Sequence, residues 1–305
     1  MTLAKHIFVS MHSYINDKHL AVKDGSSFRL AEYKTDYTAD LKSKKEGRKK
    51  LKKDKEILHD LQRKMYATDS HSVLLVFQAM DAAGKDSTIR EVFSGMFPQA
   101  SSVHSFKAPT SKELDHDYLW RSVNVLPERG KFAIFNRSYY EEVLVTRVHP
   151  EYIVGQRIPG VNSVSDIDNT FWSNRLQAIK DHERHLTSNG TIILKFFLNV
   201  SREEQKRRFI SRIETPEKNW KFNIGDLRER ARWDDYMQAY EEAIRTTACE
   251  SAPWFVIPAD NKWFMQTAVC DIIIGALQEL NLSYPTVGQK ERDELSKGLQ
   301  MLNEE

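Results

Sequence analysis

Short apolar runs alternate along the chain with longer segments in which apolar residues recur every three or four positions. The short runs are typical of strands buried on both faces, and the longer segments are typical of amphipathic helices. Five strands are predicted in this way, and they begin near residues 73, 101, 132, 191 and 254. Strands that alternate with helices favour an α/β domain built on a mostly parallel, five-stranded sheet.

The same pattern divides the chain into three parts. Residues 1–70 are expected to form an irregular arm and a long basic helix over residues 40–66, whose charged face is either a polyanion contact or simply solvated. Residues 71–285 are expected to form the core, in which helices over 170–186 and 263–280 cover the sheet. Residues 286–305 are polar and charged, and we expect this tail to fray.

The stretch SVLLVFQAMDAAGKDSTIREVF predicts a strand, a tight loop and a helix over Ser72–Phe93. Gly84 and Lys85 match the pattern G-x-x-x-x-G-K-[ST], in which backbone N–H groups and the lysine hold phosphate oxygens. Ala79 replaces the first glycine of that pattern, and Asp86 stands in the hydroxyl position. A Gly-Lys pair is also an ordinary helix start, but the flanking strand and helix favour a phosphate loop.

Other candidate phosphate ligands follow the next strands of the predicted sheet. Lys107 comes at the end of the second strand, and Asn136 and Arg137 come directly after the third. Open parallel sheets bind ligands at the edge where these strands end. The guanidinium of Arg137 presents a rigid fork of donors suited to phosphate oxygens, although it could also serve a structural ion pair.

An acidic residue at the place of Asn136 holds or orients Mg²⁺ in many phosphate-loop enzymes. An asparagine carries no negative charge, so the anionic part of that task must fall on Asp81, inside the loop, or on Glu141 and Glu142.

The segment after the fourth strand, over about residues 201–232, is basic and partly aromatic. Arg208 and Arg212 belong to a crowded basic helix that Pro216 ends, and Trp220 follows in a basic loop. At the edge of the sheet such a segment would form a lid that excludes water and adds positive charge. A solvated helix is the plainer interpretation.

Composition limits what kind of protein this is. The chain has 305 residues, is 40% hydrophobic and has a formal net charge of +2, so any affinity for polyanions must come from local clusters. Its two cysteines, Cys249 and Cys270, lie far from any metal-binding spacing, so we expect neither a zinc site nor a disulfide framework. No signal peptide or membrane-length apolar run is found, so we expect a cytoplasmic protein without a membrane partner.

These features predict a three-layer P-loop kinase fold with a helical lid and phosphoryl transfer as the reaction, since positioning and charge neutralisation supply most of that catalysis. An ATP-dependent nucleotide kinase of the thymidylate-kinase-like type needs much the same loop, arginine and lid. A nucleic-acid-binding module that uses the basic helix and the Trp220 loop is an alternative of another class, and it is less favoured.

Three motifs, MDAAGKDST, FNRSYYEEVLVTRVHPE and KRRFISRIETPEKNWKFNIGDLRER, resemble the signatures of the polyphosphate kinase 2 family in order and spacing. The likeness runs from about Leu51 to Leu280. The second motif resembles the class III branch, which accepts nucleoside mono- and diphosphates; other branches carry Asp at position 136 and Asn at position 141. The resemblance implies Mg²⁺-dependent, reversible phosphoryl transfer from inorganic polyphosphate to AMP and ADP, which yields ADP and ATP.

The resemblance also implies a role for each matching residue. Asp81 would contact the metal or orient the acceptor phosphate, while Lys85 and Arg137 would bind the phosphates. Asn136 and Glu141 would lie near the acceptor, and Glu141 would help to hold a second metal or a monophosphate. The remaining positions are the loop residues Ala82, Ala83, Gly84, Asp86 and Ser87, the strand-end Lys107, and the lid residues Arg208, which would act in transfer, and Arg212. Dimers or tetramers and a basic tunnel for the polyphosphate are further expectations.

Overall fold

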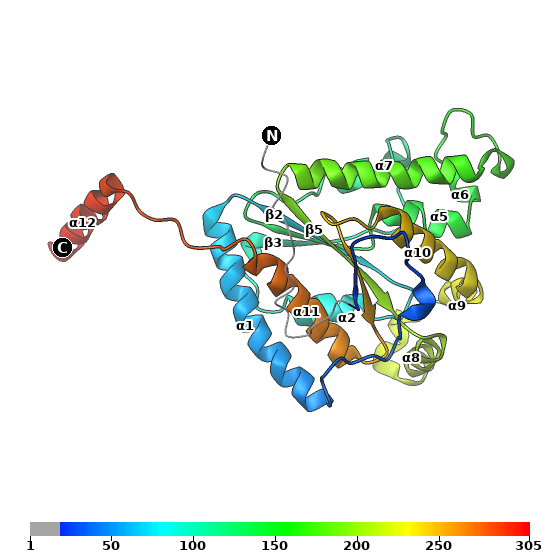
Figure 1. Cartoon of the computed structure of the whole chain (residues 1–305), viewed down its shortest axis with the longest axis horizontal. Coiled ribbons are helices and arrows are strands. Elements are labelled where there is room, and N and C mark those ends of the chain that lie inside the picture. Colours follow the sequence, from blue (N-terminus) through cyan, green and yellow to red (C-terminus); the bar gives the residue numbers. More distant parts are fainter. Residues whose placement is uncertain (1–18) are drawn as a thin grey trace.

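The computed structural model describes residues 19–305 and places one sheet between two layers of helices (Figure 1). The first eighteen residues of the expected arm lie outside the described part of the chain. The strands are β1 (Ala21–Val22), β2 (Ser72–Gln78), β3 (Ser101–Ser105), β4 (Phe132–Asn136), β5 (Thr191–Asn199) and β6 (Trp254–Pro258). Their order across the sheet is β1-β6-β5-β2-β4-β3.

The five predicted strands are all present and pair parallel with one another, as expected. The sheet nevertheless has six strands rather than five. The additional strand, β1, pairs antiparallel with β6, so that Ala21 lies opposite Phe255. A strand of two residues is too short to show any periodicity, which is why the sequence did not reveal it.

Helices cover both faces of the sheet. The longer ones are α1 (Lys44–Thr68), α2 (Lys85–Val92), α7 (Asn169–Ser188), α8 (Arg202–Glu214), α9 (Ile224–Ala231), α10 (Trp233–Thr247), α11 (Lys262–Gln278) and α12 (Gln289–Asn303). The single-turn helices are α3 (Ser111–Leu114), α4 (Trp120–Val123), α5 (Val145–Val148) and α6 (Glu151–Val154), and the 3₁₀ segments include η3 (Tyr139–Glu142) and η5 (Pro216–Lys221). Helices α1, α2 and α11 lie on one side of the sheet, and α7 and α10 lie on the other (Figure 1).

The long basic helix predicted over residues 40–66 is α1, which begins after Ser43. The Ser43 side chain accepts a hydrogen bond from the backbone N–H of Glu46, so it caps the helix. Its apolar face packs on α11, and Leu51 and Leu58 are buried there. Lys50 also faces α11 and pairs with Asp54 and Asp271, whereas most other lysines of α1 are exposed.

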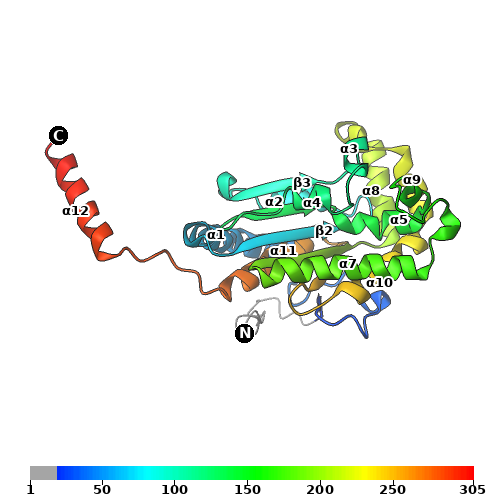
Figure 2. The ribbon, with the colours of Figure 1, turned by 90° about the horizontal axis from the view of Figure 1, so that it is seen from above.

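The tail does not fray as expected, because residues 289–303 form α12. This helix stands away from the rest of the chain at the end of an extended segment, residues 282–288, in both views (Figures 1 and 2). Leu295, Leu299 and Leu302 share one exposed face, spaced by four and three residues. None of the helices within residues 19–305 combines the length and hydropathy that a membrane crossing needs.

Helices α1 and α11 pack closely at Gly47. A methyl group at this position would overlap the Trp263 ring, and the Gly47 carbonyl accepts a hydrogen bond from Thr267 Oγ1. We expect Gly47→Ala to destabilise the protein by about 1–3 kcal/mol, because overpacking outweighs the better helix propensity of alanine. The free energy of unfolding in urea measures this change.

Gly275→Ala is the matched control, since Gly275 lies in α11 and a methyl group there would meet no atom within 4 Å. We expect this substitution to be neutral or to stabilise by up to about 1 kcal/mol. A Gly47→Ala protein as stable as the Gly275→Ala protein would contradict the tight contact.

Candidate functional site

The predicted phosphate loop is a strand–loop–helix unit at the end of β2. The loop turns between Gln78 and Lys85, the first residue of α2. Gly84 has φ +112°, and a Cβ there would lie 3.0 Å from Met265 Cε, so both the backbone conformation and the space favour glycine. Ala82 has φ +60°, a strained value of the kind found at functional turns. The first N–H groups of α2 follow this turn, and a helix leaves such groups without a partner of its own.

Lys85 is buried beneath this loop. Its Nζ donates a hydrogen bond of 2.7 Å to the Ala79 carbonyl. Burial lowers the pKa of Lys85 to about 8, and the positive charge of Arg137 contributes to the shift. A phosphate placed beside Lys85 would favour its charged form and reverse this shift.

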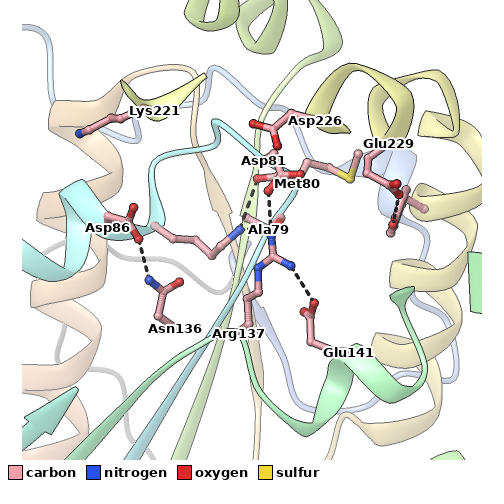
Figure 3. Close-up of polar contacts among 12 residues, drawn as sticks. Ala79, Met80, Asp81, Asp86, Asn136, Arg137, Glu141, Lys221, Asp226 and Glu229 are labelled. Carbon is pink, nitrogen blue, oxygen red and sulfur yellow. Dashed lines mark hydrogen bonds and ion pairs between the residues drawn. The ribbon is translucent and has the colours of Figure 1, made fainter. Parts of the chain in front are cut away.

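Arg137 links two carboxylates at the same edge of the sheet. Its Nη2 lies 2.9 Å from Asp81 Oδ1, and its Nη1 lies 3.2 Å from Glu141 Oε2 (Figure 3). The residue has φ +64°, and its backbone N–H donates to the Phe77 carbonyl of β2. Asp81, Lys85 and Arg137 therefore converge, as the rule for parallel strand ends predicts.

Asn136 and Asp86 form a second contact across this edge. Asn136 Nδ2 donates a hydrogen bond of 2.6 Å to Asp86 Oδ1, so the end of β4 is joined to the first turn of α2 (Figure 3). Asp86 stands where the phosphate-loop pattern has Ser or Thr, and Asn136 stands where many phosphate-loop enzymes have an acidic residue. These two substituted positions thus contact each other.

The predicted lid consists of α8, η5 and α9, and its two arginines have different partners. Arg208 is buried, and its Nη1 donates to the carbonyls of Ala82 (3.1 Å) and Ala83 (2.5 Å). Its Nη2 donates to the Ala259 carbonyl at 2.5 Å. In this structure Arg208 therefore holds the phosphate loop by its backbone, and a phosphate would have to displace these carbonyls to reach it. Arg212 pairs with Asp226 at 3.3 Å.

Two acidic residues of α9, Asp226 and Glu229, face the site, and sequence reasoning did not single them out. Desolvation raises the pKa of the half-buried Asp226 carboxyl, and the negative charge of Asp81 raises it further. Glu229 accepts hydrogen bonds from the Tyr236 hydroxyl at 2.6 Å and from His149 at 2.8 Å. In the sequence they are two acidic residues within a segment of mixed charge, so no local pattern marks them as site residues.

Two cavities flank Glu141 and Glu142. A cavity of about 250 Å³ is lined by Asp81, Arg137, Glu141, Asp226 and Glu229, among others. A larger one, of about 810 Å³, lies against the next residue, Glu142, and its lining contains both acidic and basic residues with the rings of Tyr118 and Phe171.

The sequence also predicted Lys107 and Ser87 as phosphate ligands and a metal site. Lys107 is exposed at the end of β3, where its carbonyl accepts a hydrogen bond from Arg121. Ser87 Oγ donates to the Gly84 carbonyl at 2.8 Å and so closes the first turn of α2. Among residues 19–305, no three His, Cys, Asp or Glu side chains are grouped closely enough to hold a metal without other ligands.

The chain is similar to known proteins in sequence and in structure. The family model described as polyphosphate kinase 2 matches residues 41–284. An ADP-polyphosphate phosphotransferase of Rhodopseudomonas palustris is 45% identical, over 94% of this chain and 99% of that protein. An AMP/ADP-polyphosphate phosphotransferase of Meiothermus ruber is 46% identical, over 75% of this chain and 80% of that protein.

A solved structure agrees with the sequence comparison. The crystal structure of polyphosphate kinase 2 from Arthrobacter aurescens matches with a TM-score of 0.82 and 38% identity, and the match covers 92% of this chain and 96% of that one. Family model, relatives and fold therefore coincide with the resemblance found in the three motifs, and the chain belongs to the polyphosphate kinase 2 family.

Proposed function

We propose that this protein transfers the terminal phosphoryl group of inorganic polyphosphate to AMP and ADP, reversibly and with Mg²⁺. The observation that carries this proposal is the convergence of Asp81, Lys85 and Arg137 at the end of neighbouring parallel strands. The names of the relatives from R. palustris and M. ruber support the choice of polyphosphate and adenine nucleotides. A cytoplasmic, homo-oligomeric enzyme, either a dimer or a tetramer, belongs to the same proposal.

Phosphoryl transfer requires little covalent chemistry from the protein. Lys85 and Arg137 bring two positive charges to one small volume, where they would hold the transferred group and neutralise the charge that spreads over its oxygens. Burial makes the charge of Lys85 effective, because the loop above it shields this side chain from water. The acceptor phosphate would act as the nucleophile, so no nucleophilic side chain is needed.

The carboxylates of the site suit Mg²⁺. Asp81 and Glu141 provide the hard oxygen ligands that this ion prefers, and Asp226 approaches Asp81 from α9 (Figure 3). Mg²⁺ commonly takes one or two carboxylates and completes its shell with substrate phosphates and water, so a dense protein cage is not required. When bound, the ion would neutralise phosphate charge.

The two sides of the site differ in charge. Partial burial lowers the pKa of Lys262, and the positive charges of Arg208 and Lys218 lower it further, which places a basic cluster on the side of α8 and η5. A polyanionic donor is favoured there. The cavity of about 810 Å³ beside Glu142 has mixed charge and two aromatic rings, which suits an uncharged nucleoside better than a polyanion.

The proposal is tested by incubating the purified protein with ADP, polyphosphate and Mg²⁺ in the absence of ATP. We expect ATP to form, and we expect Lys85→Met to reduce turnover at least about a hundredfold because a buried charge at the transferred group is lost. Lys290→Met in the exposed helix α12 is the control and should keep full turnover. Luminescence with luciferase measures the product.

The alternatives give different outcomes. An ATP-dependent nucleotide kinase would form no ATP from polyphosphate, and a nucleic-acid-binding module would bind RNA or DNA tightly whether or not Lys85 is intact. Absence of ATP from the wild-type reaction would refute the proposal.

Glu141 is expected to distinguish AMP from ADP. Asn136 is neutral, so Glu141 supplies negative charge near the acceptor, and it also orients Arg137 through the 3.2 Å ion pair. We expect Glu141→Asn to reduce kcat/KM for AMP at least about tenfold more than for ADP, a difference of about 1.4 kcal/mol in transition-state stabilisation. Initial rates with each acceptor measure this ratio, and Glu128→Gln in an exposed loop is the control. Equal losses on the two acceptors would contradict the assignment.

Lys85 also predicts a proton uptake when phosphates bind. Its pKa of about 8 lies below the usual value for lysine, so at pH 8 about half of the free molecules carry the proton. Bound phosphate raises this pKa, and up to about half a proton should therefore be taken up per site. Titration calorimetry with tripolyphosphate, in two buffers of different ionisation enthalpy, measures the uptake.

Lys85→Met removes this group and provides the control for protons exchanged by the phosphate itself. We expect the difference in uptake between the two proteins to fade as the pH falls below 7, where Lys85 is already charged in the free protein. An uptake that is identical in both proteins at pH 8 would show that Lys85 does not titrate on binding.

A further inference from the structure

A charged pair lies in the centre of the sheet, outside the site described above. Lys195 stands in the middle of β5, between β2 and β6, and its side chain has no exposed surface. Its Nζ lies 2.5 Å from Oε2 of Glu183, a residue of α7 whose side chain is 1% exposed. Burying such a pair carries a large desolvation cost, which good geometry and further hydrogen bonds must offset.

Those further hydrogen bonds come from two neighbouring tyrosines. The hydroxyls of Tyr139 and Tyr140 donate to Glu183 Oε1 at 2.9 and 2.8 Å. Lys195 Nζ lies 3.1 Å from the Tyr140 hydroxyl and 3.0 Å from the Thr247 carbonyl of α10. Each polar atom of the pair is therefore satisfied, and β5, α7 and α10 are joined to one short segment, η3.

That segment carries the site. Tyr139 and Tyr140 are the first residues of η3, and they stand between Arg137 and Glu141, which pair with each other at 3.2 Å. Both tyrosine rings are fully buried, so their hydroxyls are anchored away from the surface. Ser138 adds a local contact, since its Oγ accepts hydrogen bonds from the Tyr140 backbone N–H and from Gln78 Nε2.

We propose that Lys195 and Glu183 are positioning residues for phosphoryl transfer: they hold Tyr139 and Tyr140, and thereby fix Glu141 relative to Arg137. The catalytic part of this inference rests on the proposed function. The anchoring part rests on the hydrogen bonds alone. The inference explains why a lysine interrupts an otherwise apolar strand, where a leucine would pack without any desolvation cost.

The double variant Tyr139→Phe/Tyr140→Phe is the first test. It keeps both rings, and it leaves the Lys195–Glu183 pair intact while removing the two hydroxyls. We expect kcat for ADP to fall at least tenfold, while KM for polyphosphate changes less than twofold because the donor side is untouched. We also expect the backbone amides of residues 138–142 to exchange at least tenfold faster by mass spectrometry, with residues 262–278 unchanged.

The double variant Glu183→Leu/Lys195→Met is the second test, because it removes both charges together with the carboxylate that accepts the tyrosine hydroxyls, and it leaves no unpaired ion. We expect kcat to fall and exchange over residues 138–142 to rise, with kcat counted per folded molecule because the hydroxyls lose this acceptor. Asp271→Asn, which alters a buried ion pair between α1 and α11, is the matched control. It should lower the melting temperature and leave kcat per folded molecule unchanged.

A double-mutant cycle separates positioning from a general loss of structure. If Tyr140 acts through Glu141, the losses from Tyr140→Phe and Glu141→Gln should combine to less than their product. Losses that multiply, or wild-type amide exchange over residues 138–142 in both double variants, would overturn the inference. If the wild-type protein makes no ATP from ADP and polyphosphate, the proposed function fails, and the exchange measurement still decides whether the anchor exists.

Discussion

The structure of the site depends on one guanidinium shared by two carboxylates. Arg137 lies between Asp81, from the loop after β2, and Glu141, from η3 after β4. Parallel strands bring these segments to one edge, and the ion pairs then hold them together. Substrate phosphates would compete with the two carboxylates for Arg137, and a metal ion would compete with Arg137 for the carboxylates. Each ligand would replace a partner of the same sign of charge, so the net charge of the site would change little.

Hydrogen bonds inside the sheet hold the residues of this site in place. The backbone N–H of Arg137 is held by the Phe77 carbonyl, and the segment that follows it is held by tyrosine hydroxyls on a buried ion pair. A residue with positive φ tends to relax unless its surroundings prevent it. The sheet interior thus supplies the rigidity that the exposed edge cannot provide for itself.

Sequence reasoning singled out the parts of the candidate site that depend on local patterns or on a general rule of sheets. The phosphate loop follows from a strand, Gly84 and Lys85, and the place of Arg137 follows from its position after a strand. Asp226 was missed because its approach to Asp81 depends on how the lid packs, which no local pattern encodes. Lys195 gave a visible signal, a charge within an apolar strand, but its partner Glu183 lies on another element. Strand β1 was missed because two residues carry no periodicity. Helix α12 was missed although Leu295, Leu299 and Leu302 have a helical spacing, because the segment is otherwise polar and charged and these leucines cover no core.

Arg208 limits which part of the predicted lid could move. It joins the middle of α8 to the carbonyls of Ala82 and Ala83 in the loop and of Ala259 after β6. Hydrogen bonds from a charged group contribute about 1.5–3 kcal/mol each, so separating α8 from the loop costs far more than shifting the segment beyond it. That segment, η5, is largely exposed and holds Trp220, which is 78% exposed. Any closure over a bound substrate would therefore be least costly in η5, where Lys221 stands, because α9 is held to α8 by Arg230, whose Nη1 donates to the Arg202 carbonyl and to Gln205 Oε1 at 2.7 Å each.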